Sequence, residues 1–268
     1  MNAVHLPARA ADSPWFRRYS PRPAASMRLV CLPHAGGSAG FFRAWAALLP
    51  DSIELVAVQY PGREDRLDER PMDDMHALVD AIAQAMPVLL DRPYLLFGHS
   101  MGAAVAHELC LTLHGRRQRL PAHLVVSARE APARHHGGTL HRAGEDALRH
   151  ELRRLGGTPA ALLDCDEFCA LLLPRMRSDY RLIETYRPAL ATMPPLPLAI
   201  SAFVGTDDHE LASGDAEAWA QQTSQAFHLR RFAGDHFYLV PQMRQVVHAV
   251  LACAGKAATP ADAWPSTP

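Results

Sequence analysis

The sequence lacks the features that mark several large classes of protein. Its 268 residues carry a formal net charge of −1, so no excess of positive charge points to nucleic acid. No apolar run reaches the roughly 18–20 residues that a membrane-crossing helix needs, and residues 1–26 contain no apolar stretch typical of a signal peptide. We therefore expect a cytoplasmic protein that binds neither membrane nor nucleic acid.

Cysteine and phosphate-binding motifs are also scarce. The five cysteines are odd in number and form no C-x-x-C pair, which argues against a disulfide framework. No Walker-type loop occurs, and no G-x-G-x-x-G follows a strand pattern. Cys165 and Cys169 lie one helical turn apart, and His135, His136 and His141 share a glycine-containing loop. Buried helix residues and an ordinary loop explain these groups, so we expect no metal and no cofactor.

What the sequence does contain is an alternation of short apolar runs with longer helical patterns. An apolar content of 49% and a length of 268 residues suit one α/β domain with a large core. The alternation predicts a mostly parallel sheet flanked by helices. The expected strands are 28–32, 53–59, 94–97, 123–128, 198–204 and 227–232, and the expected helices are 41–49, 72–90, 103–114, 215–224 and 237–253.

One stretch interrupts this alternation. Residues 131–186 contain helical patterns but no strand pattern. We interpret them as a helical lid inserted between two core strands; a helical insertion without a role is the alternative. The α/β domain itself is expected to span 27–255, between an irregular lead-in at 1–26 and a mobile tail at 256–268.

The candidate nucleophile is Ser100, the central residue of a G-x-S-x-G pentapeptide that begins at Gly98 and ends at Gly102. A strand pattern runs directly into this motif and a helical pattern runs directly out of it, which is the arrangement of a nucleophile elbow. Small residues two positions before and after the serine allow the tight turn that this arrangement requires. A helix N-cap serine is the alternative interpretation.

Two backbone N–H groups are candidate donors to a developing oxyanion. The Met101 N–H follows the serine and opens the next helix, where the helix dipole favours negative charge. The loop after the first strand, residues 33–38, contains two glycines that allow close approach to a ligand. We select the Ala35 N–H in that loop, although a simple turn would explain the same residues.

A serine hydroxyl needs a base, and the base needs an orienting acid. In α/β hydrolases these residues follow the serine in the order acid, then histidine. His236 lies between the last strand pattern and the last helical pattern, and it is preferred to His209 and His228. Asp208, in the third position after a strand-ending glycine, is preferred as the acid to Asp207.

These motifs stand within longer segments that together resemble the type II thioesterases, the standalone editing enzymes of non-ribosomal peptide and polyketide synthesis. The segments are PHAGGSAGFFRAW, VQYPGREDR, DRPYLLFGHSMGA, LRRLGGTP, LPRMRSDYRLIETY, FVGTDDHE and GDHFYL. The resemblance runs from about Arg28 to Val250 and implies an α/β-hydrolase fold with a helical lid. Many relatives have Asp-Pro at the acid turn, whereas here His209 follows Asp208.

The resemblance also implies a reaction and a partner. The substrate would be an acyl or aminoacyl thioester on the phosphopantetheine arm of an acyl or peptidyl carrier protein, hydrolysed through an acyl-Ser100 ester. The family requires no cofactor, and a monomer is expected. Basic residues of the predicted lid, among them Arg153 and Arg154, are candidates for docking an acidic carrier protein; for any one such cluster, a solvated helix face is the preferred alternative.

Three alternatives stay open at this point. A carboxylesterase or lipase would use the same residues on oxygen esters, because esters and thioesters share a tetrahedral intermediate. A product-releasing thioesterase would cyclise a finished chain. A non-catalytic protein of the same fold would bind a ligand without hydrolysing it.

Overall fold

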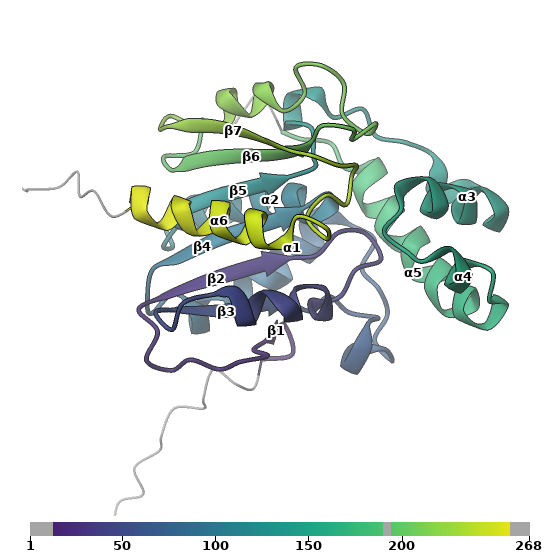
Figure 1. The fold of residues 1–268 in the computed structure, drawn as a ribbon, viewed down its shortest axis with the longest axis horizontal. Helices are drawn as coiled ribbons and strands as arrows, with labels where there is room; N and C mark the ends of the chain where they lie inside the picture. The colour runs from purple at the N-terminus through teal and green to yellow at the C-terminus, as the bar shows by residue number, and fades with distance from the viewer. Residues whose placement is uncertain (1–12, 190–193, 258–268) are drawn as a thin grey trace, which may run out of the picture.

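The computed structural model describes residues 13–189 and 194–257. Its centre is a seven-stranded sheet in the order β1-β3-β2-β4-β5-β6-β7 (Figure 1). All neighbouring strands are parallel except β1 and β3, which pair antiparallel. The strands are β1 (Phe16–Arg17), β2 (Met27–Leu32), β3 (Ile53–Val58), β4 (Tyr94–His99), β5 (His123–Ser127), β6 (Ala199–Gly205) and β7 (Phe227–Phe232).

The six strands predicted from apolar runs all form, each within two residues of its expected ends. Every residue of β3, β4 and β5 is buried, as expected for central strands covered on both faces. β7 lies at an edge, and its alternating exposed residues match that place. The predicted parallel α/β sheet is therefore confirmed.

Helices cover both faces of the sheet. α1 (Met75–Ala85) and α2 (Met101–Gly115) pack on one face, and α6 (Met243–Ala257) and the 3₁₀ segment η1 (Ala39–Leu48) lie on the other (Figure 1). The strands' side chains alternate between these faces and so contribute to two separate apolar cores. This three-layer arrangement keeps the carboxyl ends of the strands free of the flanking helices.

Two helix ends differ from prediction because of proline. Helix α1 ends at Ala85 rather than near residue 90, and the short 3₁₀ segment η3 (Met86–Leu89) follows, with Pro87 in its first turn. Helix α6 begins at Met243 rather than at 237, just after Pro241. Proline has no N–H to donate to the preceding turn, which disfavours an α-helix through Pro87 and Pro241, although the longer helix at 166–185 accommodates Pro174.

Two expected α-helices are 3₁₀ segments instead. Residues 41–49 were expected to be helical, and the chain there forms η1. Residues 215–224 contain η6 (Glu217–Gln222). The 3₁₀ helix has the tighter period of three residues, which apolar spacing alone does not distinguish in such short segments. Three further short 3₁₀ segments are η2 (Glu64–Arg66), η4 (Pro132–Arg134) and η5 (Leu140–Arg142).

The lead-in that was expected to be irregular contributes to the sheet. Phe16 pairs with Val58 and Arg17 with Ala57, so β1 covers the outer edge of β3. Phe16 is buried in the apolar core on the sheet face that α1 and α2 cover, and this burial stabilises the short strand. The rest of the predicted lead-in up to residue 12, and the predicted tail from residue 258, lie outside the described residues.

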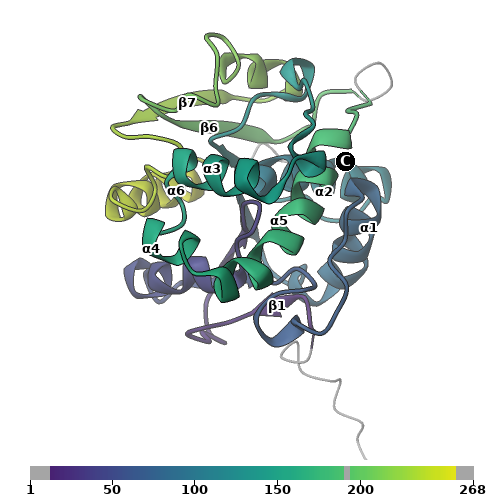
Figure 2. The same ribbon diagram turned by 90° about the vertical axis from the view of Figure 1, so that its right-hand side faces the viewer.

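Three helices form the predicted insertion between β5 and β6. They are α3 (Glu145–Leu155), α4 (Ala160–Leu163) and α5 (Asp166–Thr185). Figure 2 shows them side by side across the carboxyl end of the sheet. They share a small apolar core of their own, which includes Leu148 and Leu163. We call residues 131–186 the lid insertion.

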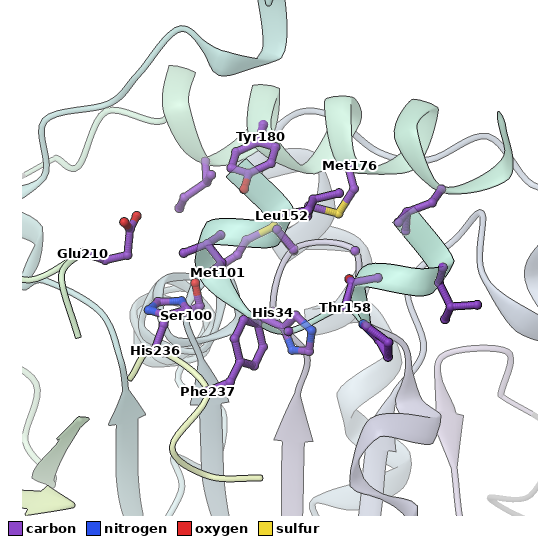
Figure 3. Close-up of a pocket in the computed structure, with 18 of the residues that line it drawn as sticks. His34, Ser100, Met101, Leu152, Thr158, Met176, Tyr180, Glu210, His236 and Phe237 are labelled. Atoms are coloured by element: carbon purple, nitrogen blue, oxygen red, sulfur yellow. The ribbon is translucent and has the colours of Figure 1, made fainter. Parts of the chain in front are cut away.

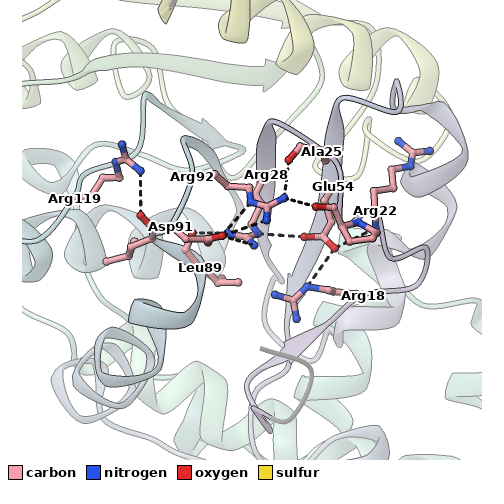
Figure 4. Close-up of polar contacts among 11 residues, drawn as sticks. Arg18, Arg22, Ala25, Arg28, Glu54, Leu89, Asp91, Arg92 and Arg119 are labelled. Carbon is pink, nitrogen blue, oxygen red and sulfur yellow. Dashed lines mark hydrogen bonds and ion pairs between the residues drawn. The ribbon is translucent and has the colours of Figure 1, made fainter. Parts of the chain in front are cut away.

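A buried ion pair joins β2 and β3 at the end of the sheet opposite the lid insertion. Arg28 on β2 donates to Glu54 on β3 at 3.1 Å, and both side chains are 5% exposed. Arg28 also donates to the Leu89 carbonyl and pairs with Asp91 (Figure 4). Arg18 lies 3.4 Å from the same glutamate. This network ties β2 and β3 to the loop before β4, far from the lid insertion.

The cysteines fit the expectation from their number. All five are free thiols, and four of them are buried. In the part of the chain that the structure describes, no three His, Cys, Asp or Glu side chains gather as metal ligands. None of the helices among these residues is both long and apolar enough to cross a membrane.

Acid stability should depend on His107, a buried residue of α2 beside Trp219. Burial lowers the pKa of His107 to about 4, whereas an unfolded histidine has a pKa of about 6.5. Between these values the unfolded chain binds more protons, so stability falls as the pH falls. The wild type should therefore lose unfolding free energy between pH 7 and pH 5. In His107→Phe this loss should be smaller by about 2 kcal/mol, as measured by urea unfolding at each pH.

The exposed His114 of the same helix provides the control. His114→Phe should keep the wild-type difference between the two pH values. An unchanged pH dependence in His107→Phe would contradict the assignment of this histidine as a neutral core residue.

Candidate active site

Ser100 lies where β4 ends and α2 begins. Its backbone angles are φ 52° and ψ −119°, a conformation that costs energy for any residue other than glycine. Neighbouring segments hold it there, because Ser100 N–H donates to the Ser127 carbonyl at 2.8 Å and the Ser100 carbonyl accepts from Ala103 N–H at 2.9 Å. The predicted strand, tight turn and helix are therefore all present around this serine.

The glycines on either side of Ser100 allow this turn. A Cβ on Gly98 would overlap the backbone of Gly102, and one on Gly102 would overlap the carbonyls of Leu32 and Pro33. Two backbone segments thus approach so closely that only hydrogen fits between them. The G-x-S-x-G spacing has a steric cause in this structure.

His236 and Asp208 meet as expected from their order in the chain. The His236 ring nitrogen Nδ1 lies 3.1 and 3.0 Å from the two Asp208 carboxylate oxygens, and both side chains are buried. Since a carboxylate only accepts, Nδ1 carries the proton and Nε2 is left for another partner. Asp208 also accepts from the Glu210 N–H at 3.0 Å, which fixes the carboxylate.

The rival residues lie elsewhere. Asp207 is exposed and accepts from the Thr206 hydroxyl, and His209 and His228 are exposed as well.

Figure 3 shows the side chains of Ser100 and His236 side by side. Among the described residues the Ser100 hydroxyl makes no hydrogen bond, and such contacts commonly tighten when substrate binds.

Met101 and Ala35, whose N–H groups are the predicted donors, line the same cavity as Ser100. Met101 is the first residue of α2, where an N–H group has no partner within the helix. Ala35 follows β2, in the loop that faces the serine from the neighbouring strand. The structure thus brings together all five residues singled out from the sequence.

Two further histidines, His34 and His99, lie near His236. Burial lowers the pKa of His34 to about 3, assisted by nearby His236 and Arg63. Burial likewise lowers the pKa of His99, whose Nδ1 lies 2.9 Å from the Ser127 hydroxyl. Both rings are therefore neutral at neutral pH. His99 packs behind the turn, whereas the half-buried His34 lines the cavity beside Ser100.

A cavity of about 290 Å³ opens beside Ser100 beneath the lid insertion. Figure 3 shows Met176 and Tyr180 of α5 and Leu152 of α3 above the serine, with Phe237 below. The wall is largely apolar and includes Leu152, Leu155, Phe168, Leu172, Met176 and Phe237. This branch of the site suits an apolar group attached to the reacting carbon.

A second cavity, of about 460 Å³, meets the first at Ser100 and His236. Its wall is more polar than that of the first cavity and carries both signs of charge. The charged and polar side chains include Arg129, Glu130, His135, Glu151, Glu184 and Glu210. The serine thus lies where an apolar branch and a polar branch join.

Sequence reasoning did not select Arg129 or Glu210, which border both branches. A signal for Arg129 exists, because it closely follows β5, and ligands bind at the carboxyl ends of parallel strands. Glu210 comes two residues after the acid, in the same loop. For the apolar residues of the lid insertion, spacing in the sequence does not distinguish those that line the cavity from those that pack in the core of the insertion.

The geometry and the sheet order define a serine hydrolase of the α/β class. A family model described as "Thioesterase domain" matches residues 27–253. The chain therefore belongs to the thioesterase family, and the resemblance that the motifs indicate is confirmed.

Individual relatives agree with this family. The chain is 39% identical over 235 residues to a protein of Streptomyces griseus named as a probable cadicidin biosynthesis thioesterase, with 87% of this chain and 63% of that protein covered. It is 38% identical to thioesterase PikA5 of Streptomyces venezuelae, over 88% of this chain and 84% of the relative.

A solved structure is similar as well. The type II thioesterase BorB from the borrelidin biosynthetic cluster superimposes with a TM-score of 0.82 at 38% identity, covering 89% of this chain and 97% of that chain. This likeness extends over most of the length of both chains. The α/β-hydrolase fold is thus confirmed independently of the site residues.

The turn at Ser100 should not tolerate a methyl group at Gly98. We expect Gly98→Ala to lower the unfolding free energy by about 3 kcal/mol, because the added Cβ meets backbone that cannot rotate away. Fluorophosphonate labelling of Ser100 should be lost at the same time. Urea unfolding and gel fluorescence measure the two effects.

Gly115, at the end of α2, is the matched control because a Cβ there meets no atom within 4 Å. Gly115→Ala should leave labelling intact and stability unchanged or up to about 1 kcal/mol higher. Normal labelling by Gly98→Ala would contradict the steric account of the turn.

Proposed function

We propose that this protein hydrolyses acyl or aminoacyl thioesters from the phosphopantetheine arm of carrier proteins, through an acyl-Ser100 intermediate. The observation that carries the proposal is the place of Ser100 at the junction of an apolar and a polar cavity beneath the lid insertion. Its relatives include thioesterases named for biosynthetic pathways. In this role the protein would clear misprimed or stalled carriers and restore their free thiol.

The proposed reaction has two halves that use the same residues. Ser100 Oγ attacks the thioester carbonyl while His236 Nε2 takes the hydroxyl proton. The C–S bond then breaks, the phosphopantetheine sulfur leaves as a thiol with that proton, and an ester joins the acyl group to Ser100. Water next attacks the ester with His236 as base, and the free acid and the serine hydroxyl are released. Asp208 keeps the His236 ring oriented throughout.

The charge that develops on the carbonyl oxygen needs donors already in place. In the proposal, the Met101 and Ala35 N–H groups supply them, the first from the start of α2 and the second from the loop after β2. Such donors act on the transition state rather than on the bound substrate, so they raise kcat.

The two cavities suggest how the substrate lies. An apolar acyl chain matches the wall formed by Leu152, Met176 and Phe237. The phosphopantetheine arm contains amides and a hydroxyl, which match the polar branch near Arg129 and Glu210. In this orientation the scissile carbonyl falls at the junction, beside Ser100.

The two lid arginines considered for carrier docking are paired with carboxylates of this chain. Arg153 pairs with Asp164, and Arg154 pairs with Glu151 and Glu210. These contacts already use the charges that an acidic partner would need. Reversal of either charge would disturb internal pairs as well as any docking.

Removal of the nucleophile is the first test. We expect Ser100→Ala to lower kcat on an acyl-loaded carrier by about 10⁴-fold or more, since the remaining groups cannot form the acyl-enzyme. Intact-mass spectrometry of the carrier follows loss of the acyl group over time. Wild-type rate in Ser100→Ala would contradict the proposal.

Substrate preference separates the proposal from an esterase. We expect kcat/KM for a carrier-bound acyl thioester to exceed that for the p-nitrophenyl ester of the same acid, because the polar branch contacts only the phosphopantetheine arm. The free N-acetylcysteamine thioester is the control for the arm. Equal or faster hydrolysis of the oxygen ester would favour a carboxylesterase.

A further inference from the structure

Helix α5 of the lid insertion reaches the loop after β2 through one carboxylate. Asp179 Oδ2 accepts a hydrogen bond from the Gly36 backbone N–H at 2.6 Å and is ion-paired with Arg63 Nη2. The Asp179 side chain is 2% exposed and that of Arg63 is 4% exposed. Three segments that are far apart in the sequence therefore meet at one buried oxygen atom.

The same helix touches Gly36 at a second point. Gly36 has a positive φ of 75°, and a Cβ added there would overlap the Met176 sulfur, one turn before Asp179. Met176 and Gly36 both line the cavity beside Ser100. Helix α5 is thus in close contact with the loop that precedes η1, at the edge of the site.

The far end of this loop is held from the core rather than from the lid insertion. Ala39 N–H donates to Gln59 Oε1 at 2.7 Å, and Gln59 Nε2 donates to the Arg63 carbonyl at 2.8 Å. The Ser38 hydroxyl donates to Glu64 at 2.5 Å. The segment from Gln59 to Glu64 therefore orders residues 38–39, while the Gly36 N–H is held by Asp179.

We propose that Asp179 is a positioning residue for the reaction at Ser100, an inference that rests on the proposed function. The Gly36 N–H belongs to the peptide unit next to the one that carries the Ala35 N–H. The two units are joined at the Ala35 Cα, so holding the first limits the rotations about the Ala35 N–Cα and Cα–C bonds by which the second could turn. An oxyanion donor is effective only when it is aimed before the charge develops. Asp179 thereby contributes to kcat without touching the substrate.

A purely structural role makes a different prediction. A buried ion pair that only fastens the lid insertion to the core would affect the number of folded molecules and leave the rate of each folded molecule unchanged. The Arg28–Glu54 pair provides a matched control, because both of its side chains are buried and lie at the amino ends of β2 and β3, whereas Ser100 follows the carboxyl end of β4.

The experiment compares Asp179→Ala, Asp179→Asn, the double variant Arg63→Met/Asp179→Leu and the control Glu54→Ala. Each is titrated with a fluorophosphonate to count competent sites, and kcat and KM on a short acyl thioester are expressed per titrated site. Inhibition by a trifluoromethyl ketone with the same acyl chain reports on the oxyanion donors, because its tetrahedral adduct carries the oxyanion. Thermal unfolding is recorded for every variant.

Asp179→Ala should lower kcat per titrated site by about 10- to 100-fold, with a smaller change in KM and a comparable loss of ketone affinity. Asp179→Asn should keep most of kcat, since its amide oxygen can still accept from the Gly36 N–H. The double variant removes both buried charges and should recover stability, yet its kcat should stay low because Gly36 has lost its acceptor. Glu54→Ala should lose stability and keep its kcat.

A double variant with wild-type kcat per titrated site would overturn the inference. An equal loss of kcat in Glu54→Ala would do so as well, because the effect would then follow from general destabilisation. If the wild type neither labels nor hydrolyses the thioester, the proposed function itself fails, and this is evident before any variant is compared.

Discussion

At Ser100 the chain leaves strand β4 with a left-handed backbone, φ 52°, and enters helix α2 in the next residue. Strain of this kind costs on the order of 1–3 kcal/mol and persists only where surrounding structure enforces it. Here the enforcement comes from backbone packed against backbone, Gly98 on Gly102 and Gly102 on the loop after β2. The parallel neighbours β2 and β5 are thus required for the serine to face the site.

Much of this arrangement could be predicted from the sequence. Central parallel strands are buried on both faces and therefore form apolar runs in the sequence. These runs predict the strand ends to within two residues. The loop residues Asp208 and His236 could be placed because, in α/β hydrolases, the acid and then the histidine follow the serine along the chain. The choice of Asp208 over Asp207 rested on position within the turn, and the hydrogen bonds to His236 agree with it.

The features that could not be predicted depend on contacts between distant segments. Strand β1 is only two residues long and forms because the Phe16 side chain is buried in the core. The difference between an α-helix and the 3₁₀ segment η1 is too small for apolar spacing to show. Asp179 is one charged residue among several on α5, and its meeting with Gly36, 143 positions away, has no local signal. The site therefore depends on both a predictable turn and an unpredicted link to the lid insertion.

The central claim is that Ser100 receives an acyl group from a carrier-bound thioester. Rapid quenching of the wild-type protein with an acyl-loaded carrier, followed by peptide mass spectrometry, tests this most directly. The account predicts that the peptide containing Ser100 gains the mass of the free acid less one water, before the free acid accumulates. Release of free acid with no transient modification of that peptide, or modification of a different residue, would contradict it.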